Sequence, residues 1–334
     1  MNRGRITWLL ESFQALVAAA GPARRWHALE TLLSRGRFSN HGPGYGDELR
    51  CSLFGLAIKS SAPVAALTRI ADGAADADDG SYWLRLDPVS LRADMTRVIM
   101  TGHGFADLNE PERREIENTV RSVAVQEGIG FHTHHPERWS LGLQQPLPFD
   151  FTPLEDALGM DLAEVLPNHP AALYWRRFLN EIQMALHACP VNARRRRLGR
   201  SEINSVWIWG GGFTPSAASG RTYDAVYADR PVTRGLAMLH GCALSELNAA
   251  ANADFGQNRG SILLDWSRPV KDPEVELERL ERLAGRVLEL VKHQGFSVDL
   301  CMSGGTHYFF DRRCLRRWWK RRNPLAYYHH CAQP

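Results

Sequence analysis

The chain has 334 residues, of which 44% are hydrophobic and 23% are charged, and its formal net charge is +3. This composition suffices for one large or two modest domains of about 100–200 residues each, and it excludes an intrinsically disordered chain. Nucleic-acid-binding domains usually have an isoelectric point above about 9. The value near 8.6 found here therefore indicates no nucleic-acid partner.

The sequence predicts a cytoplasmic protein without a membrane partner. No stretch approaches the roughly 18 apolar residues of a membrane span. Glu11 and Gln14 interrupt the apolar stretch after the basic start, so it lacks the unbroken core of about 7–15 residues that a signal peptide needs. The six cysteines show no metal-binding spacing, and a chain with its own core needs no disulfides, so we expect reduced thiols.

The N-terminal part of the chain predicts helices. Apolar residues recur at helical spacing over Ile6–Ala20, which indicates an amphipathic helix, and a second helix is expected over Arg24–Ser34. Asp47 is expected to cap a third helix that runs through Leu56. The small and acidic residues 71–80 predict a surface loop.

The middle of the chain predicts an α+β region, inserted over residues 71–170. Two strands, Tyr82–Leu86 and Thr96–Met100, are expected to be separated by a turn at Asp87-Pro88. A helix and two short strands follow, at Pro111–Glu127, Ile129–His132 and Arg138–Leu141.

The last part alternates strands and helices, which predicts a parallel sheet with crossover helices. The expected helices are Ala171–His187, Val232–Leu239 and Pro273–His293, and the expected strands are Ser205–Trp209, Ala225–Ala228 and Ser261–Asp265. Ser297–Met302 and Thr306–Phe310 predict a hairpin around Ser303-Gly304-Gly305. We expect residues 1–70 and 171–334 to form one α/β core domain.

The most distinctive segment, Ile203–Gly212, predicts a buried strand that runs into a turn of three glycines, Gly210, Gly211 and Gly212. One interpretation is a ligand loop, because backbone N–H groups of glycines can cradle an anion. Asn204, Trp207 and Trp209 would then add polar contacts to a small anionic ligand. The other interpretation is a tight turn that needs positive φ. The segment matches no nucleotide-binding motif.

Several segments carry a resemblance to a known family: Leu179–Met184, Pro190-Val191-Asn192, Ile203–Gly212, Leu84–Val89, Glu137-Arg138-Trp139 and the basic stretch 316–325. They resemble a bacterial family labelled cofactor-independent phosphoglycerate mutase, which also resembles regulatory proteins of plant-pathogen quorum-sensing clusters. More distantly, the layout resembles the alkaline-phosphatase superfamily. The resemblance implies an α/β fold with an alkaline-phosphatase-like core sheet and a smaller inserted α+β region.

The chain departs from the chemistry that this resemblance implies. Enzymes of that superfamily bind two metal ions through Asp and His and use a Ser or Thr nucleophile. Here no aspartate precedes Asp47, and no Asp-His dipeptide occurs. Two metals need several anionic or imidazole ligands. We therefore predict a degenerate protein with a regulatory or binding role and no metal cofactor. The alternative is a metal-dependent phosphoglycerate mutase or phosphatase with other ligands.

Two smaller candidates remain. His132 and His134 lie two residues apart on a predicted strand and form a weak candidate metal pair. Asp87 lies between Arg85 and Arg92, which indicates either an anchor for a polar ligand or a structural ion pair that holds a turn.

Two basic runs give a second alternative function, the binding of an anion or a nucleic acid. One run comprises Arg194–Arg197 with Arg200, and the other surrounds Trp318 and Trp319 within residues 312–322. The competing interpretation is a solvated helix face with the tryptophans packed on the body of the protein. We expect little nucleic-acid binding.

Overall fold

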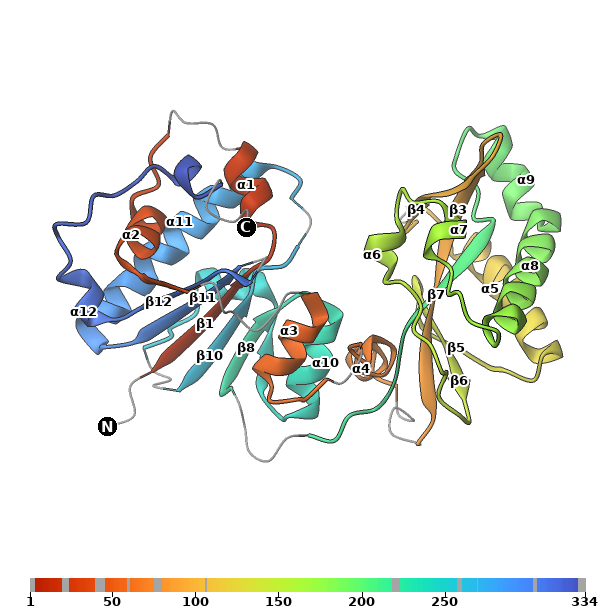
Figure 1. Ribbon diagram of the computed structural model, residues 1–334, viewed down its shortest axis with the longest axis horizontal. Coiled ribbons are helices and arrows are strands. Elements are labelled where there is room, and N and C mark those ends of the chain that lie inside the picture. The colour runs from red at the N-terminus through yellow and green to blue at the C-terminus, as the bar shows by residue number, and fades with distance from the viewer. Residues whose placement is uncertain are drawn as a thin grey trace. The chain divides into compact units, whose positions relative to one another are not determined.

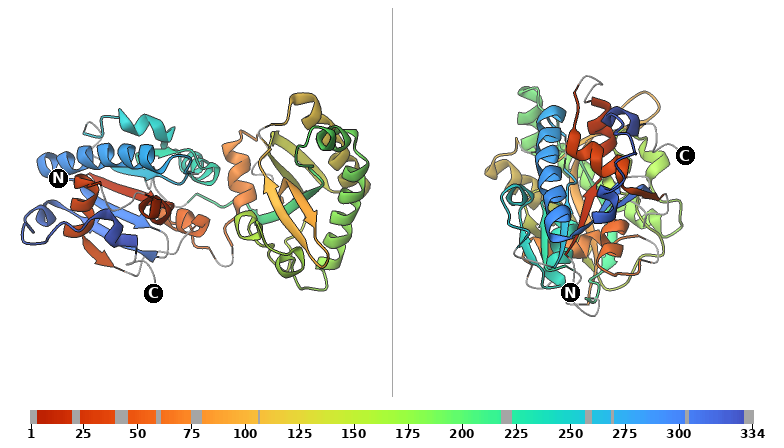
Figure 2. Two further views of the ribbon diagram at one scale, coloured as in Figure 1. Left: turned by 90° about the horizontal axis from the view of Figure 1, so that it is seen from above. Right: turned by 90° about the vertical axis from the view of Figure 1, so that its left-hand side faces the viewer.

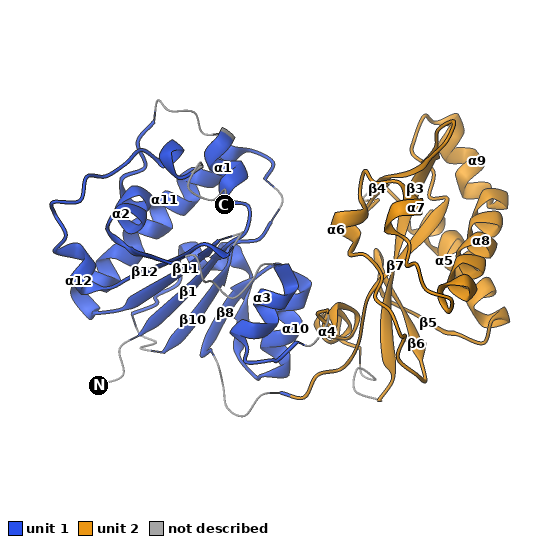
Figure 3. Ribbon diagram, in the orientation of Figure 1, with its two compact units in different colours: residues 1–58, 217–334 blue, residues 59–216 orange. Residues whose placement is uncertain are grey.

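The computed structural model describes residues 4–19, 24–39, 46–58, 61–74, 80–105, 107–217, 223–256, 260–268, 270–302 and 305–329 (Figure 1). The chain forms two compact units (Figure 3). Unit 1 comprises residues 1–58 and 217–334, and unit 2 comprises residues 59–216. The inserted region is thus longer than the predicted 71–170.

Unit 1 contains a seven-stranded sheet in the described part of the chain, with strand order β2-β12-β11-β1-β10-β8-β9. The strands are β1 (Arg5–Leu10), β2 (Arg37–Ser39), β8 (Ala225–Ala228), β9 (Ala243–Ser245), β10 (Ser261–Asp265), β11 (Ser297–Met302) and β12 (His307–Phe310). β1 pairs in parallel with β10 and with β11, and β8 pairs in parallel with β10 and β9. β12 returns antiparallel to β11, as the predicted hairpin requires, although Ser303 and Gly304 of its turn lie outside the described residues.

The prediction of a helix over Ile6–Ala20 is wrong at its start. Arg5–Leu10 forms β1, and only Phe13–Ala19 forms a helix, α1. Every residue from Ile6 to Leu10 is buried, because β1 lies between two parallel strands and both of its faces are covered. Such central strands have continuous apolar runs, which a short window does not distinguish from a buried helix.

The helices of unit 1 are α1, α2 (His27–Arg35), α3 (Gly46–Leu53), α10 (Pro231–Leu239), α11 (Pro273–Glu289) and α12 (Arg312–Leu315), with shorter turns η1 (Leu247–Ala251), η2 (Leu290–Gln294) and η4 (Leu325–His329). α11 runs along the sheet in the left view of Figure 2. Leu277, Leu280, Leu283 and Val287 on its buried face share one core with Trp8 of β1. On the opposite face of the sheet, Leu9 packs with Leu49 of α3 and Cys301 of β11.

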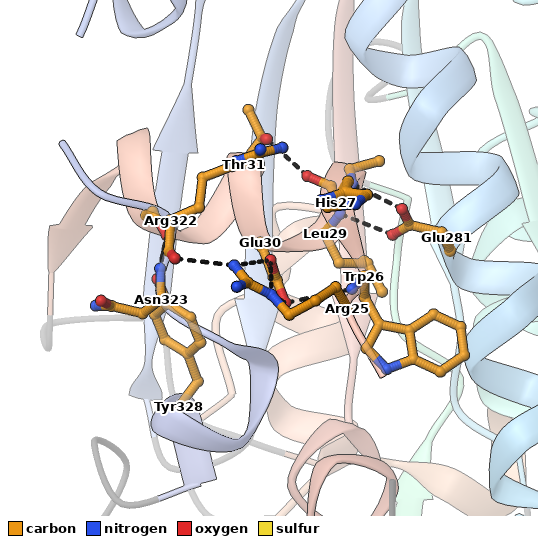
Figure 4. Close-up of polar contacts among 12 residues, drawn as sticks. Arg25, Trp26, His27, Leu29, Glu30, Thr31, Glu281, Arg322, Asn323 and Tyr328 are labelled. Atoms are coloured by element: carbon orange, nitrogen blue, oxygen red, sulfur yellow. Dashed lines mark hydrogen bonds and ion pairs between the residues drawn. The ribbon is translucent and has the colours of Figure 1, made fainter. Parts of the chain in front are cut away.

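The first turn of α2 is held by a carboxylate from a neighbouring helix (Figure 4). Glu281 of α11 accepts hydrogen bonds from the backbone N–H groups of Ala28 (2.7 Å) and Leu29 (3.0 Å), two of the amides that a helix leaves without internal partners. α3 begins at Gly46, so the predicted capping role of Asp47 is wrong, and Asp47 lies in the first turn instead. Residues 40–45 before α3 lie outside the described residues.

Unit 2 contains an antiparallel sheet in which β3 pairs with β4, β6 and β7, and β5 pairs with β6. Its strands are β3 (Tyr82–Ala93), β4 (Val98–His103), β5 (Gly130–His135), β6 (Arg138–Leu143) and β7 (Ser205–Phe213). Its helices are α4 (Val64–Ala71), α5 (Glu110–Gln126), α6 (Leu154–Ala157), α7 (Leu162–Val165), α8 (Ala172–Ala188) and α9 (Pro190–Arg197). α4 packs on β3 and β7, whereas α5 and α8 pack together.

Two sequence predictions for unit 2 are wrong. The predicted turn at Asp87-Pro88 lies in the middle of β3, a twelve-residue strand in which both residues are buried. Pro88 lacks a backbone N–H, which usually confines proline to strand edges or bulges. The strand after residue 204 joins β3 in this antiparallel sheet and not the parallel sheet of unit 1. For this reason the boundary of unit 2 lies at residue 216, beyond the predicted 170.

No helix in the described ranges has both the length and the apolar composition needed to cross a membrane. Of the predicted surface loop 71–80, residues 75–79 lie outside the described residues. The cysteines within the described residues, which are Cys51, Cys189, Cys242, Cys301 and Cys314, form no disulfide with one another.

Candidate functional site

A cluster of charged side chains lies at the carboxyl edge of the parallel sheet of unit 1, the edge where open α/β sheets place their ligands. We call it the carboxyl-edge cluster, and it comprises Glu11, Asp47, Arg50, Thr233, Asp265 and Ser267. Glu11 follows β1 directly, and Asp265 is the last residue of β10. Asp47 and Arg50 come from α3, and Thr233 comes from α10.

The guanidinium of Arg50 contacts all three carboxylates of this cluster. Its Nη2 lies 2.7 Å from Oε2 of Glu11, its Nη1 lies 3.2 Å from Oδ1 of Asp47, and its Nε lies 3.1 Å from Oδ2 of Asp265. The side chain of Arg50 is 1% exposed, and that of Asp265 is 0% exposed. The hydroxyls of Thr233 and Ser267 donate to the two carboxylate oxygens of Asp265. A buried charge is tolerated only with this degree of pairing.

The charges of Arg50, Asp265 and Glu11 compensate one another despite their burial. Burial opposes the charge of Arg50, but the attraction of Asp265, Asp47 and Glu11 outweighs burial and raises the pKa of the guanidinium. Burial alone would raise the pKa of Asp265, yet the charge of Arg50 and the hydrogen bonds from Ser267 and Thr233 lower it. The pKa of Glu11 is likewise raised by burial and lowered further by Arg50, so that it falls below its usual range.

A divalent metal does not fit this cluster as it stands. Carboxylates bind metals through lone pairs on their oxygens, and here the carboxylates of Glu11, Asp47 and Asp265 already accept from one guanidinium. No group of three or more His, Cys, Asp or Glu side chains in the described ranges is arranged to hold a metal ion. The positive charge at this edge is supplied by the chain itself.

Sequence reasoning did not identify the carboxyl-edge cluster. The signal was present in the two carboxylates that end or follow apolar strands, Asp265 and Glu11. Arg50, however, lies 215 residues from Asp265 in sequence, and no spacing pattern connects them. The helical spacing of apolar residues over Ile6–Ala20 also conceals that Glu11 stands at the end of a strand.

The three glycines predicted as a turn belong to strand β7 of unit 2. Gly210 has φ of 63°, and a Cβ there would lie 2.8 Å from Cβ of Val64 at the start of α4. A Cβ on Gly212 would lie 2.4 Å from Cβ of Pro63, and one on Gly211 would lie 2.4 Å from the hydroxyl oxygen of Tyr82. These close approaches explain the glycines by packing within unit 2. A ligand at this segment stays a prediction.

The polar groups of the neighbouring candidates also have partners inside unit 2. The side-chain amide of Asn204 donates to the carbonyl of Leu91 (2.8 Å) and accepts from its N–H (2.7 Å). The indole N–H of Trp207 donates to the carbonyl of Thr152 at 2.9 Å. Because β7 pairs with β3 only as far as Ser205, the amide of Asn204 continues the pairing by one more residue.

The structure brings Arg85, Asp87 and Trp209 together. Nη2 of Arg85 lies 2.5 Å from Oδ1 of Asp87, and the indole N–H of Trp209 donates to Oδ2 of the same carboxylate. The Cζ atom of Arg85 lies 5.1 Å from the centroid of the Trp209 ring. All three side chains are buried, whereas Arg92, the fourth candidate, is exposed near the end of β3. Within this group the ion pair is a structural element of the β3–β7 interface.

His132 and His134 point to the same side of β5, as predicted from their spacing. Their rings are stacked with centroids 6.1 Å apart, and His132 packs edge-to-face on Trp83 at 5.0 Å. The pair thus takes part in aromatic packing.

A hollow of about 570 Å³ in unit 2 is a further candidate for a small ligand. Its lining includes Met95, Arg97, Arg176, Asn180 and Gln183. Asn180 and Gln183 belong to one of the segments on which the sequence resemblance rests. None of the predicted ligand residues lines this hollow.

The chain was compared with protein families, with curated proteins and with solved structures, and its sequence is similar to those of phosphoglycerate mutases. No family model matches it. Over 176 residues it is 28% identical to the 2,3-bisphosphoglycerate-independent phosphoglycerate mutase of Methanosarcina barkeri, which covers 50% of this chain and 44% of that protein. Over 180 residues it is 23% identical to the enzyme of the same name from Methanosarcina mazei, which covers 52% of this chain and 44% of that protein. The chain thus spans less than half the length of these curated relatives.

Among solved structures, the chain is similar to the PH0037 protein from Pyrococcus horikoshii, with a TM-score of 0.53 and 14% sequence identity. The likeness covers 93% of this chain and 87% of that one, and it concerns the fold alone. The predicted α/β fold class is confirmed. The chain is phosphoglycerate-mutase-like in sequence at low identity.

Proposed function

We propose that this protein is a non-catalytic relative of the mutases, with a binding or regulatory role, in which a buried arginine replaces metal ions at the carboxyl edge of the core sheet. The observation that carries this proposal is the contact of Arg50 with Glu11, Asp47 and Asp265. A two-metal reaction needs ligand oxygens that are free to coordinate. In the carboxyl-edge cluster these oxygens accept from the protein's own cation instead.

The competing function, a metal-dependent phosphoglycerate mutase, is favoured by the names of the curated relatives. The departures of this chain from the ligand pattern weigh against it. β1 is followed by Glu11-Ser12, and the neighbouring carboxylate of Asp265 is wholly buried. A binding role remains compatible with the hollow in unit 2, whose lining combines Arg97 and Arg176 with the amides of Asn180 and Gln183.

The test is turnover together with metal content. The purified protein is assayed for interconversion of 3-phosphoglycerate and 2-phosphoglycerate with Mg²⁺, Mn²⁺, Co²⁺ or Zn²⁺ added, and its metals are measured by elemental analysis. We expect no turnover above the buffer rate and no stoichiometric metal. Turnover that a chelator abolishes and Mn²⁺ restores would overturn the proposal and establish the mutase function.

A further inference from the structure

Two adjacent tryptophans of unit 1 have a far larger exposed fraction than any other tryptophan of the chain. Trp318 is 78% exposed and Trp319 is 64% exposed. The other eight tryptophans are each no more than 8% exposed. The interpretation that Trp318 and Trp319 pack on the body of the protein is therefore wrong. Contiguous exposed apolar surface with a polar rim is typical of an interaction site.

These indoles lie on a segment that is held at both ends. We call residues 316–323 the tryptophan loop; it joins α12 to η4. Before the loop, the side chain of Cys314 is 1% exposed, and after it, Leu325 is 2% exposed. The backbone N–H of Asn323 donates to the hydroxyl of Ser34 at 3.1 Å. Both ends of the tryptophan loop are therefore anchored to unit 1, while the tryptophans between them are exposed.

An ion pair between Glu30 of α2 and Arg25, which precedes this helix, reinforces the attachment (Figure 4). The carboxylate of Glu30, which is 0% exposed, accepts hydrogen bonds from Nε and Nη2 of Arg25 at 2.8 to 3.0 Å. Arg25 in turn donates to the backbone carbonyl of Arg322 at 3.0 Å. On the other side of the loop, Arg317 donates to the carbonyl of Arg35 at 3.2 Å. The first contact uses the backbone of the loop, whereas the second uses the side chain of Arg317. Trp318 and Trp319 take part in neither contact and are exposed.

The surroundings of the indoles are strongly basic. Residues 312–322 contain seven cationic side chains and no acidic one: Arg312, Arg313, Arg316, Arg317, Lys320, Arg321 and Arg322. All except Arg317 are exposed. The whole chain has a net charge of only +3, so without these seven cations the remainder would have a net charge of −4. The positive charge is thus concentrated around the tryptophan loop.

An exposed pair of indoles within a basic surface fits two kinds of polyanion, and the ring geometry distinguishes them. Single-stranded nucleic acids stack successive bases on aromatic faces that lie nearly parallel. The rings of Trp318 and Trp319 are inclined at 83°, with centroids 6.1 Å apart, so they do not form a continuous stacking platform. Indoles at a membrane interface have no such requirement, because each ring has only to place its apolar body among lipids and its N–H near the headgroups.

We propose that the tryptophan loop is a docking site for anionic phospholipid membranes. Trp318 and Trp319 enter the boundary between headgroups and acyl chains, while the surrounding arginines and Lys320 contact the anionic headgroups. The association is peripheral and reversible, since it depends on two inserted indoles and screened charge. The inference rests on the tryptophan loop alone and is independent of the function proposed for the carboxyl-edge cluster.

The test is cosedimentation of the full-length protein with sucrose-loaded vesicles. We expect binding to vesicles of phosphatidylcholine and phosphatidylglycerol at a ratio of about 3:1, and none to phosphatidylcholine alone, with binding that weakens as salt rises. Trp318→Ala with Trp319→Ala should weaken the apparent Kd by about tenfold or more, and Arg316→Gln with Arg321→Gln and Arg322→Gln should flatten the salt dependence. Since both indoles are exposed, the double variant should retain the wild-type melting temperature.

The matched control is the other basic run, in unit 2. There Arg194 is paired with Glu115 at 2.8 Å, Arg195 with Asp107 at 3.0 Å, and Arg196 with Glu202. Arg196→Gln with Arg197→Gln and Arg200→Gln removes three cations, as the test variant does, and should leave vesicle binding unchanged. Equal binding to neutral vesicles, binding that survives the double tryptophan variant, or tryptophan-dependent binding to single-stranded DNA without vesicle binding would overturn the proposal.

Discussion

Nε of Arg50 lies 3.1 Å from Oδ2 of Asp265, and the two side chains are 1% and 0% exposed. The partners come from α3 and β10, which are separated by most of the chain, and Glu11 completes the arrangement from the end of β1. Three elements of unit 1 are therefore joined through one guanidinium. We expect this relationship to determine both the stability of the carboxyl edge and its capacity for metal ions.

Replacing Arg50 with Met should destabilise unit 1 by about 3–5 kcal/mol at pH 7, because it leaves the carboxylates of Asp265, Asp47 and Glu11 without their main cation. Urea denaturation followed by circular dichroism measures the change. Arg282→Met, an exposed position on α11, is the control and should leave the midpoint nearly unchanged. A loss of less than about 1 kcal/mol for Arg50→Met would show that the carboxylates do not depend on it.

The same variant should change how stability depends on pH. The pKa values of Glu11 and Asp265 are lower in the folded protein than their ordinary values of 4.5 and 3.8. Such carboxyls stabilise the folded state above the ordinary pKa, and this stabilisation is lost as the pH falls through the folded pKa. Without Arg50, burial still raises the pKa of both carboxyls, and only the hydrogen bonds from Ser267 and Thr233 to Asp265 and the charge of Arg230 near Glu11 oppose it. Protonation of the two carboxyls should therefore stabilise the folded variant relative to its state at pH 7. The difference in unfolding free energy between wild type and Arg50→Met should narrow from pH 7 to pH 4, and a constant difference would contradict this account.

Removal of metal ions should not affect the stability of the protein. The cation of the carboxyl-edge cluster is a side chain, which a chelator cannot extract. Melting temperatures measured before and after dialysis against EDTA should agree. A fall of several degrees that Mn²⁺ reverses would point to a resident metal and count against Arg50 as its replacement.

Gly212→Ala should destabilise unit 2 by about 1–3 kcal/mol, because the new Cβ would lie 2.4 Å from Cβ and 2.8 Å from Cα of Pro63. Gly102→Ala in β4 provides the control. It is a strand glycine of the same sheet with no atom within 4 Å of the added Cβ, and it should be neutral or slightly stabilising. Chemical denaturation distinguishes the two. If Gly212→Ala kept full stability, packing against α4 would not explain the glycine.

Asn204→Ala should destabilise unit 2 by about 1–3 kcal/mol, since it leaves the partly buried backbone N–H and carbonyl of Leu91 without their side-chain partner. Asn118→Ala, at an exposed site on α5, should be close to neutral. Hydrogen exchange at the Leu91 amide gives a local readout, and faster exchange is expected in the variant. Unchanged protection at Leu91 would mean that the amide finds another acceptor.

Segments with an unambiguous local pattern were predictable from the sequence. β8, β10 and β11 have the predicted bounds, and α5 and α8 lie within one residue of theirs at each end. These segments combine a clear period with capping or turn residues, as Asn109 shows by accepting from the N–H of Glu112 at 2.9 Å. Local chemistry alone determines such boundaries.

β1 and β3 were mispredicted because tertiary pairing determines them. Ile6–Leu10 has a helical spacing by coincidence, and its strand form depends on β10 and β11 from the other end of the chain. Asp87-Pro88 has turn chemistry, yet pairing with β7 over Tyr82–Val89 keeps this part of β3 extended.

In the candidate sites, too, contacts between residues close in sequence were predictable, whereas contacts between distant segments were not. The pairing of Arg85 with Asp87 could be anticipated, since the residues lie two apart on one strand. The contribution of Trp209 from β7 could not, and neither could the convergence on Arg50.

Unit 1 is built from two segments of the chain that are separated by unit 2, and this arrangement affects the newly synthesised polypeptide. Unit 2 is one continuous segment, complete once residue 216 has left the ribosome. β1 is synthesised long before both of its neighbours in the sheet, β10 and β11, which begin at Ser261 and Ser297. The apolar run Ile6–Leu10 therefore emerges long before the partners that bury it, a situation that favours aggregation or capture by chaperones. Nascent chains of this protein should depend on chaperones mainly through Ile6–Leu10.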